Sequence, residues 1–537
     1  MCSPLPSRTC QNTGRTRLSA YTAQALATGR YPLLSFTREI AIKQNRHAEL
    51  VSAPHLLSSQ YVVDLSCGFP KQVRDDVGSS SRFLKIGCFH GLFNGDIKYT
   101  FSAYSRLMSF HDPIRQSKYL RQTLSQDKKP VGFFISAGCP LAVKMPNDDQ
   151  WPLIPDVAGL TKYVSEELLK DDEIEDGKER SIHEIYTLLI EEIGKAGKKS
   201  ANIEDILSFV RGMKQISTGA TNVRGFTDAE LADLEINICK RIAEKLKVSL
   251  PDNKTPYHKL AKWIHNIERD TAIEIFTTNY DLLVEEAFEY IGVPYFDGFV
   301  GSKQPFFDLR AVEDGLIPKH WSRLWKIHGS INWYHKNKKD VYRSTSLEES
   351  DPCIIQPSHL KYDQSRKMPY LALIDRLNKF LRQNSAVLIM SGYSFSDEHL
   401  NDTILNALKA NPTAMVIGLL FGTLTYKEGT PEKTIVRYEQ ALKLSENRSN
   451  LSIWSYDEAV IGGLRAKWRP AKADYEADDN IANAIKCLIE KTKDEDGNET
   501  ENSITRYEFQ LGDFSILGDF LQELIGKEQF KIEDNGN

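Results

Sequence analysis

The sequence of 537 residues lacks the features that mark several classes of protein. Its eight cysteines include no C-x-x-C pair, so a four-cysteine zinc site is not expected. No apolar stretch reaches the roughly 18–20 residues of a membrane-spanning helix, and the first residues lack the apolar core of a secretory signal. The G-x-G-x-x-G dinucleotide fingerprint and the G-x-x-x-x-G-K-[ST] phosphate loop are also missing. These absences predict a reduced, cytoplasmic protein with free thiols.

A strong excess of one charge is missing too. The net charge is −5, with 41% hydrophobic and 26% charged residues, which is typical of an ordinary globular protein and does not point to nucleic acid. Residues 1–106 differ, because they carry 13 Lys and Arg against 6 Asp and Glu. We expect residues 1–117 to form a poorly defined extension, whose basic charge leaves nucleic-acid binding open for that segment alone.

Apolar runs that end in small or polar residues recur from residue 118 onward. The runs VGFFISAGCP, AIEIFTTNYD and VLIMSGYSFSD each read as a buried strand followed by a loop. Such strands alternate with helical periods, which predicts an α/β fold with a Rossmann-like, mostly parallel sheet over residues 118–468. Apolar residues at three- and four-residue steps predict a helical insert at 171–270. An acidic, helical C-terminal region is expected at 469–537.

Two of these loops carry candidate ligand groups. In Ser136–Pro140, small residues after a strand let the backbone approach a pyrophosphate, although a tight turn without a ligand is an equally good interpretation. Thr277–Asp281 places five hydrogen-bonding side chains in a row, which would be costly to bury without partners. These side chains therefore face a ligand or solvent, and Asn279 or Asp281 can instead cap the helix that follows.

Two further motifs add a base and hydroxyl groups. The imidazole of His328 can accept a proton near pH 7, and Gly329 leaves space beside it, although a single histidine is more often structural. Gly392–Asp397 supplies a glycine and two hydroxyls, while Ser396 or Asp397 is also suited to cap the next helix. Ligands of open α/β sheets bind beyond the carboxyl ends of the strands, so these loops are expected to converge on one site.

In this order, the four motifs resemble those of the sirtuin family, and more closely the sirtuin-like domains of bacterial antiphage defence proteins. The resemblance extends over roughly residues 118–460. Ser136–Pro140 is similar to the family's small-residue loop, Ile154–Asp156 to its flexible cofactor loop, Thr277–Asp281 to its Thr-x-Asn-x-Asp motif, His328–Gly329 to its catalytic pair and Gly392–Ser394 to its Gly-x-Ser loop. Ser136 replaces a glycine and Pro140 a serine, and the two C-x-x-C pairs of the deacylases' zinc module are missing.

The resemblance implies an NAD⁺ glycohydrolase, which cleaves NAD⁺ to nicotinamide and ADP-ribose without a metal. Asn279 would fix the attacking water, and His328 would act as general base. The cofactor-binding residues would be Ala137, Gly138 and Cys139 at the pyrophosphate, Asp281 in the network on the nicotinamide side, and Gly392 and Ser394 at the adenosine ribose, together with Ser136, Asp156 and Thr278.

Two other functions remain open at this stage. The same site would suit a protein deacylase or an ADP-ribosyltransferase, and it would also suit a sensor that binds NAD⁺ or ADP-ribose without cleaving it. For the glycohydrolase, the resemblance implies a role in abortive infection. Unchecked loss of NAD⁺ would kill the host, so we expect a resting state controlled by a homo-oligomer, a partner defence protein or a phage-derived trigger, with no membrane involved.

Overall fold

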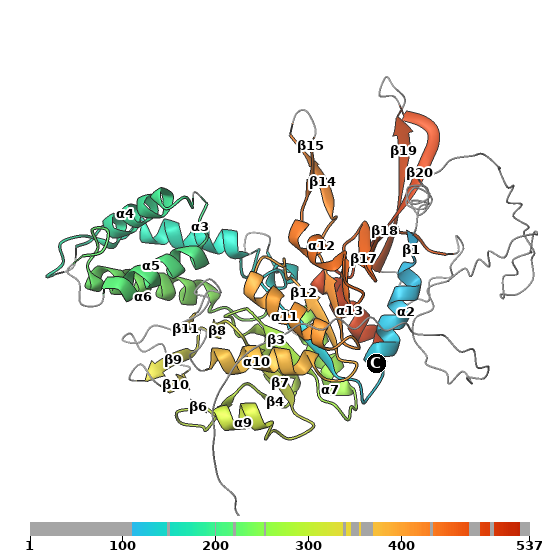
Figure 1. Cartoon of the computed structure of the whole chain (residues 1–537), viewed down its shortest axis with the longest axis horizontal. Helices are drawn as coiled ribbons and strands as arrows, with labels where there is room; N and C mark the ends of the chain where they lie inside the picture. Colours follow the sequence, from blue (N-terminus) through green and yellow to red (C-terminus); the bar gives the residue numbers. More distant parts are fainter. Residues whose placement is uncertain are drawn as a thin grey trace, which may run out of the picture. The chain divides into compact units, whose positions relative to one another are not determined.

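The central sheet consists of ten strands, seven of which form its parallel body. In spatial order they are β1 (Phe110–His111), β18 (Leu464–Trp468), β17 (Glu458–Ile461), β16 (Leu451–Trp454), β13 (Met415–Leu419), β12 (Val387–Ser391), β2 (Val131–Ile135), β3 (Glu274–Thr277), β7 (Ser322–Lys326) and β4 (Tyr295–Phe296). The run from β16 to β4 is parallel throughout, and β17 is antiparallel to both of its neighbours. The predicted α/β fold with a mostly parallel sheet is confirmed (Figure 1).

This computed structural model describes residues 110–526, except 148–150, 175, 199, 218–221, 252–253, 337–339, 345–353, 356–368, 430–432, 472–483 and 494–498. All of the described residues belong to the second of two units, Asn94–Asn537. Most of the extension expected at 1–117 therefore lies outside the described residues. The sheet begins earlier than residue 118, because β1 pairs with β18. No helix among the described residues is long and apolar enough to cross a membrane.

The direction of the chain through the sheet reverses between β2 and β12. From β2 the chain adds β3 and then β7 on one side, whereas from β12 it adds β13 and then β16 on the other. Neighbouring strands whose connections run in opposite directions leave a crevice outside their carboxyl ends, where ligands of such sheets bind. The loops that follow β2 and β12 border this crevice.

Helices cover both faces of the sheet, because successive side chains of a strand point to opposite faces. On β2, Phe133 and Ile135 enter one core cluster, whereas Phe134 enters the other. The first core includes helices α2 (Pro113–Leu124), α7 (Pro256–Asn266), α8 (Leu283–Ile291) and α13 (Phe514–Leu524). The second core includes α9 (Leu309–Asp314), α10 (Tyr370–Leu381), α11 (Glu398–Ala410) and α12 (Glu439–Ser445).

A bundle of four helices is inserted between β2 and β3. It consists of α3 (Val157–Leu168), α4 (Ile182–Lys195), α5 (Ile203–Ser217) and α6 (Asp228–Leu246), which pack on one another (Figure 1). The expected bounds of 171–270 differ from this arrangement at both ends. Helix α3 belongs to the bundle through its contacts with α4, α5 and α6, whereas α7 packs on α8 and α13 instead.

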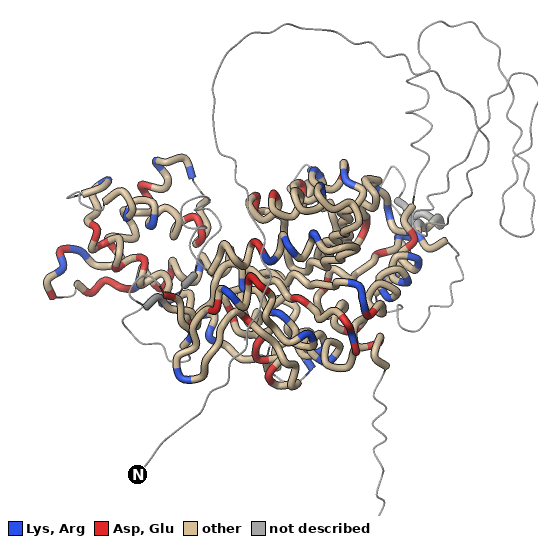
Figure 2. The backbone as a smooth tube through the Cα atoms, turned by 60° about the horizontal axis from the view of Figure 1, so that its bottom comes forward, with Lys and Arg blue, Asp and Glu red and all other residues tan. Residues whose placement is uncertain are grey.

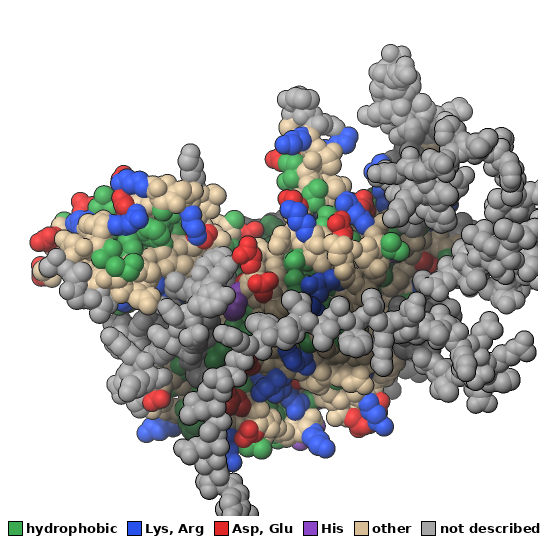
Figure 3. Space-filling model, in the orientation of Figure 1, with side chains coloured by type: hydrophobic (Ala, Val, Ile, Leu, Met, Phe, Trp, Pro, Cys, Tyr) green, Lys and Arg blue, Asp and Glu red, His purple; other side chains and the backbone are tan. Residues whose placement is uncertain are grey.

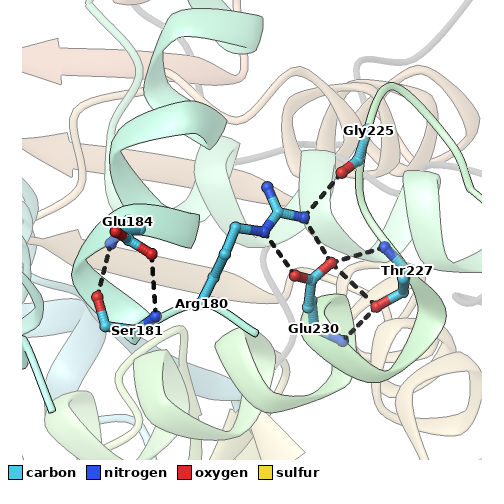
Figure 4. A network of polar contacts seen from close by, with 6 residues as sticks. All are labelled: Arg180, Ser181, Glu184, Gly225, Thr227 and Glu230. Carbon is cyan, nitrogen blue, oxygen red and sulfur yellow. Dashed lines mark hydrogen bonds and ion pairs between the residues drawn. The ribbon is translucent and has the colours of Figure 1, made fainter. Parts of the chain in front are cut away.

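Two capping boxes define the starts of α4 and α6. The hydroxyls of Ser181 and Thr227 accept from the N–H groups of Glu184 and Glu230, whose carboxylates accept from the N–H groups of the caps in return (Figure 4). Arg180 holds the two starts together, because its guanidinium donates to both carboxylate oxygens of Glu230, each at 2.7 Å. Such a bidentate pair is among the stronger side-chain contacts, so it helps to fix the start of α4 against the start of α6.

The C-terminal region contains a hairpin as well as the expected helix. Strands β19 (Ile485–Lys493) and β20 (Glu499–Phe509) pair in antiparallel fashion, so the helical expectation was wrong for this segment. Helix α13 follows and buries Phe514, Leu517, Phe520 and Leu521 against α7. Helix α13 is thus part of the first core.

Four short strands build a smaller sheet beside β4 and β7. Its order is β5 (Phe299–Val300), β6 (Phe306–Phe307), β10 (Asp340–Arg343) and β9 (Trp333–Lys336). Three further pairs complete the strands: β8 (Gly329–Ser330) with β11 (Ile354–Ile355), β14 (Thr425–Glu428) with β15 (Lys433–Val436), and the hairpin above. A 3-10 turn, η1 (Pro140–Ala142), follows the loop after β2.

Candidate active site at the strand ends

The loops after β2 and β12 touch through their backbones at the crevice. The N–H of Gly138 donates to the carbonyl of Gly392 at 3.0 Å, and the N–H of Ser136 donates to that of Ser391 at 3.1 Å. Gly392 has a φ of +70°, and a Cβ added to it would lie 2.6 Å from the backbone N of Cys139. Only glycine fits both the left-handed conformation and the close approach. The two loops are thereby locked into one wall.

The loop after β3 joins the same cluster. The hydroxyls of Thr278 and Ser136 are 2.7 Å apart, and the side-chain amide of Asn279 donates to the carbonyl of Ser136 at 3.4 Å. The N–H of Asn279 also donates to the hydroxyl of Thr277 at 3.0 Å. Thr278 and Asn279 are both half-buried, so their polar atoms are oriented by these bonds while part of each side chain remains accessible.

Asp281 lies behind this surface and is almost fully buried. Its carboxylate accepts from the N–H of Leu283 at 3.1 Å, at the start of α8. Burial raises the pKa of Asp281 to about 6, although the Lys326 ammonium and a hydrogen bond from the Asn279 side chain oppose the shift. Lys326 is itself buried, and its Nζ donates to the backbone carbonyl of Asp281 and, at 2.8 Å, to the Glu285 carboxylate.

His328 follows β7 beside the loop after β3. Thr277 of β3 pairs with Lys326 of β7, and the N–H of Ile327 donates to the carbonyl of Thr277 at 2.8 Å. Asn279 therefore lies two residues beyond the end of β3, and His328 lies two residues beyond the paired end of β7. The Nε2 atom of His328 is 3.4 Å from the Oδ2 atom of Asp397, which begins α11 after β12. This contact connects the loops after β7 and β12.

The remaining predicted residues have different surroundings. Ser394 and Ser396 are both exposed, and their hydroxyls lie 2.9 Å apart. Because both are exposed, both hydroxyls can contact a ligand. Ala137 is half-buried at the turn. The side chain of Cys139 is buried and its thiol donates to the carbonyl of Ser391, and burial raises the pKa of this thiol to about 12. Because Cys139 is fully buried and its N–H donates to the carbonyl of Ser136 at 2.9 Å, its contact with a pyrophosphate stays a prediction.

Asp156 has a local role in the described structure. Its exposed carboxylate caps α3 by accepting from the N–H of Gly159 at 2.8 Å. No hydrogen bond within the described ranges ties it to the four loops. A contact between Asp156 and NAD⁺ stays a prediction, which would require the segment before α3 to approach the ligand.

Three residues make contacts at the site that the sequence motifs did not indicate. Lys326 supports the loop after β3 by donating to the backbone carbonyl of Asp281. Asp397 contacts His328 in addition to capping α11. The hydroxyl of Tyr280 donates to the Glu204 carboxylate at 3.2 Å, which links the loop to α5 of the bundle. A charged residue inside the apolar run LWKI was the one sequence signal for Lys326. The other two contacts join residues far apart in the chain.

A separate pocket of about 410 Å³ lies near α9, away from these loops. Its lining comprises Phe296, Val300, Asp308, Arg310, Ala311, Leu316, Ile317, Pro318 and Trp321. None of the predicted site residues lines it. Among the described residues, no group of three or more His, Cys, Asp or Glu side chains could hold a metal ion.

Comparison with known proteins gives a family for the part of the chain that carries three of the four loops. Residues 273–437 match the model of the SIR2-like domain. This segment includes the Thr277–Asp281 motif, His328 and the Gly392 loop, all at strand ends of one sheet. The protein contains a SIR2-like domain. A domain of this kind suggests NAD-dependent chemistry of the sirtuin type.

Solved Sir2 structures resemble the chain at low similarity. A structure of Sir2Tm bound to a propionylated peptide is 13% identical, with 57% of this chain and 87% of that chain covered and a TM-score of 0.25. A second one, which concerns the mechanism and regulation of Sir2 enzymes, is 12% identical, with 57% and 85% covered and the same TM-score. No curated protein matches the sequence. The assignment of the SIR2-like domain therefore rests on the family match and on the site described above.

Proposed function

We propose that the SIR2-like domain is an NAD⁺ glycohydrolase that releases nicotinamide and ADP-ribose. The observation that carries this proposal is the convergence of four loops at the point where the sheet reverses direction, with Asn279 and His328 on adjacent strand ends. Dinucleotides bind at such points in open α/β sheets. The match of residues 273–437 to the SIR2-like domain supports NAD⁺ as the ligand.

The bond that is broken determines what the site must supply. The C–N bond between the ribose and nicotinamide breaks with its electron pair leaving on nicotinamide, so positive charge develops on the ribose. A water molecule then forms the new C–O bond at the anomeric carbon, and its proton must be accepted by a base. Electrostatic stabilisation of the transition state and one oriented water are therefore the main requirements.

Each loop has a part in this proposal. Gly138 and Gly392, which have no side chains, would let the pyrophosphate approach the backbone closely. The hydroxyls of Ser394 and Ser396 would bind the adenosine ribose. The half-buried amide of Asn279 would hold the ribose hydroxyls and the attacking water. His328 would take the proton, directly or through a ribose hydroxyl.

Removal of the base is the sharpest test of this proposal. We expect His328→Ala to lower the rate of nicotinamide release by about 10²–10⁴-fold, the usual cost of losing a general base. His320→Ala, which removes an exposed histidine preceding β7, is the matched control and should leave the rate unchanged. If His328→Ala cleaved NAD⁺ within a few-fold of the unmodified protein, His328 would have no catalytic role.

The products also separate hydrolysis from transfer. We expect equal amounts of nicotinamide and ADP-ribose from NAD⁺ in water, with no gain on adding an acetyl-lysine peptide. O-acetyl-ADP-ribose formed from such a peptide would identify a deacylase instead. Modified protein acceptors would identify an ADP-ribosyltransferase, and tight binding without nicotinamide release would identify a sensor.

We further propose that NAD⁺ depletion serves abortive antiphage defence and is restrained by self-association. The resemblance of the ordered motifs supports the first part. The second part is supported by the bundle, whose helices expose Leu188, Ile190, Ile216 and Ile236, and Figure 3 shows hydrophobic side chains gathered on its visible face. Basic and acidic residues are interspersed along the described backbone (Figure 2), which favours a second copy over a nucleic acid as the partner.

A further inference from the structure

We propose that Asp397 is a positioning residue for His328, and that it fixes which ring nitrogen of the imidazole takes the proton. This inference rests on the proposed function, since it assigns a further residue to the same reaction. Asp397 lies at the start of α11, on the loop after β12, whereas His328 follows β7 on the far side of β2 and β3. Their contact therefore spans the crevice at which the other loops meet.

The two side chains form a shielded contact. The His328 Nε2 atom lies 3.4 Å from the Asp397 Oδ2 atom, and the side chains are 12% and 10% exposed. A carboxylate so well shielded from water requires partners, because desolvation of a charge is costly. The separation is longer than an ordinary hydrogen bond, as is common for catalytic pairs in the absence of substrate.

The two oxygens of Asp397 have separate tasks. Its Oδ1 atom accepts from the N–H groups of His399 at 2.9 Å and Leu400 at 3.1 Å, which caps α11. With Oδ1 held by the cap, Oδ2 is directed toward the histidine. A simple helix cap uses only one of the two oxygens, so the geometry goes beyond the capping role that the sequence suggests.

The loop that carries Asp397 is held in place by buried bonds. The hydroxyl of Tyr393 donates to the backbone carbonyl of Asp397 at 3.2 Å and to the Asn401 Oδ1 atom at 3.0 Å. The side-chain amide of Asn401 donates in turn to the carbonyl of Phe395 at 2.8 Å, and Phe395 has a φ of +61°. These bonds stabilise a backbone conformation that a non-glycine residue rarely adopts. The carboxylate is consequently presented to His328 from a preorganised support.

The chemical consequence follows from the two nitrogens of the ring. In a neutral imidazole, one nitrogen carries a proton and the other accepts one. A carboxylate beside Nε2 favours the tautomer with its proton on Nε2 and leaves Nδ1 as the acceptor. When the attacking water loses a proton to Nδ1, the ring becomes an imidazolium whose positive charge the Asp397 carboxylate stabilises.

Other charged groups near the two loops are occupied by their own contacts. Lys326 of β7 bonds to the carbonyl of Asp281 and to Glu285 of α8. On α11, Glu398 is exposed and His399 is half-buried beside the cap. These groups are the same in the Asp397 variant and in a variant of a matched helix cap. A difference between the two variants therefore reports on Asp397 alone.

The test replaces the carboxylate while keeping the cap. Asp397→Asn retains an oxygen that can cap α11 and removes the charge. The matched control is Asp112→Asn, because Asp112 caps α2 with the same pattern, accepting from Ile114 at 3.0 Å and Arg115 at 3.4 Å. Both variants lose one carboxylate and keep a capping side chain, so the comparison isolates the contact with His328.

We expect Asp397→Asn to lower kcat for NAD⁺ cleavage at least about tenfold with little change in KM, since the base is worth about 10²–10⁴-fold in all. The acid limb of its kcat profile should move to lower pH, because the imidazolium has lost its anionic neighbour. Asp112→Asn should match the unmodified protein in both respects. Equal kcat values and superimposable pH profiles for Asp397→Asn and Asp112→Asn would overturn the assignment.

A second readout separates this inference from the proposed function. The ring signals of His328 can be followed against pH by NMR of protein with labelled histidine, and identified by their loss in His328→Ala. Whether or not the protein cleaves NAD⁺, we expect these signals to titrate at lower pH in Asp397→Asn than in Asp112→Asn. Identical titrations would show that Asp397 does not act on the ring.

Discussion

Gly392 determines how closely the two central loops approach each other. Its left-handed backbone and its contact with Cys139 each exclude a side chain, for separate reasons. Gly138 is equally close, since a Cβ added there would lie 2.8 Å from the Cα of Gly392. The wall of the site is therefore made of backbone atoms without side chains, which lets a ligand approach it closely.

The two reasons can be separated by experiment. Gly392→Ala introduces both an unfavourable φ and a clash, whereas Gly315→Ala, at a φ of +67° with open space around it, introduces the φ alone. Each should lose about 1–2 kcal/mol of unfolding free energy for the left-handed conformation. We expect Gly392→Ala to be the less stable in urea titrations and to cleave NAD⁺ far more slowly. Equal stability and unchanged cleavage in both variants would contradict the close packing of the loops.

The buried carboxyl of Asp281 predicts a dependence of stability on pH. Burial raises its pKa from 3.8 to about 6 in the folded protein, so the folded state holds a proton that the unfolded state releases earlier. The contribution of Asp281 is then most favourable below the unfolded pKa and is lost as the pH rises through about 6. A shift of about two units corresponds to roughly 3 kcal/mol.

Asp281→Asn removes this titration. We expect the variant to gain stability relative to the unmodified protein between about pH 4 and about pH 7, by an amount on the order of 3 kcal/mol. Urea titrations at the two pH values measure the difference. If the two proteins lost or gained stability in parallel over this range, the carboxyl would not be perturbed by burial.

Local sequence signals predicted many individual residues, and long-range contacts explain the misses. The caps expected at Asp281 and Asp397 follow from short-range chemistry, and both side chains accept from N–H groups at the start of the next helix. The contact of Asp397 with His328 depends on the order of strands in the sheet, which no local pattern encodes. Its capping role was visible in the sequence, whereas its contact with His328 was not.

Helices were predicted more reliably than the C-terminal hairpin. Within the insert expected at 171–270, the structure has helices α4, α5, α6 and α7, and each of them combines an apolar stripe with clear ends. The segment Ile485–Lys493 fits a strand as well as a helix, since three of its apolar residues, Ile485, Cys487 and Ile489, fall at alternate positions, with Leu488 between the last two. The following EDGNET contains an Asp-Gly pair, which is a turn signal that favours the hairpin.

Helix α13 stabilises the domain rather than acting as a removable tail. Tyr257 of α7 contacts Phe514 with ring centroids 5.1 Å apart, and Leu517 is fully buried between the helices. We expect Leu517→Ala to lower the unfolding free energy by about 2–5 kcal/mol. Leu316→Ala, at a leucine that is 63% exposed, is the matched control and should change it little. A thermal midpoint that is the same in both variants would contradict the docking of α13.

At the scale of the molecule, several modules among the described residues adjoin the site. The bundle reaches the site through the bond between Glu204 and Tyr280, and the C-terminal helix supports it through α7 and α8. This arrangement is compatible with an enzyme whose activity is held back until a trigger acts, as the proposed function requires.

The most direct test of the proposed function is incubation of the purified full-length protein with NAD⁺, with nicotinamide followed by chromatography. The unmodified protein should release nicotinamide and ADP-ribose in equal amounts, whereas Asn279→Ala and His328→Ala should both be nearly inactive. The same rate of release from either variant, or intact NAD⁺ bound stoichiometrically to the unmodified protein, would contradict a hydrolase site at the convergence of these loops.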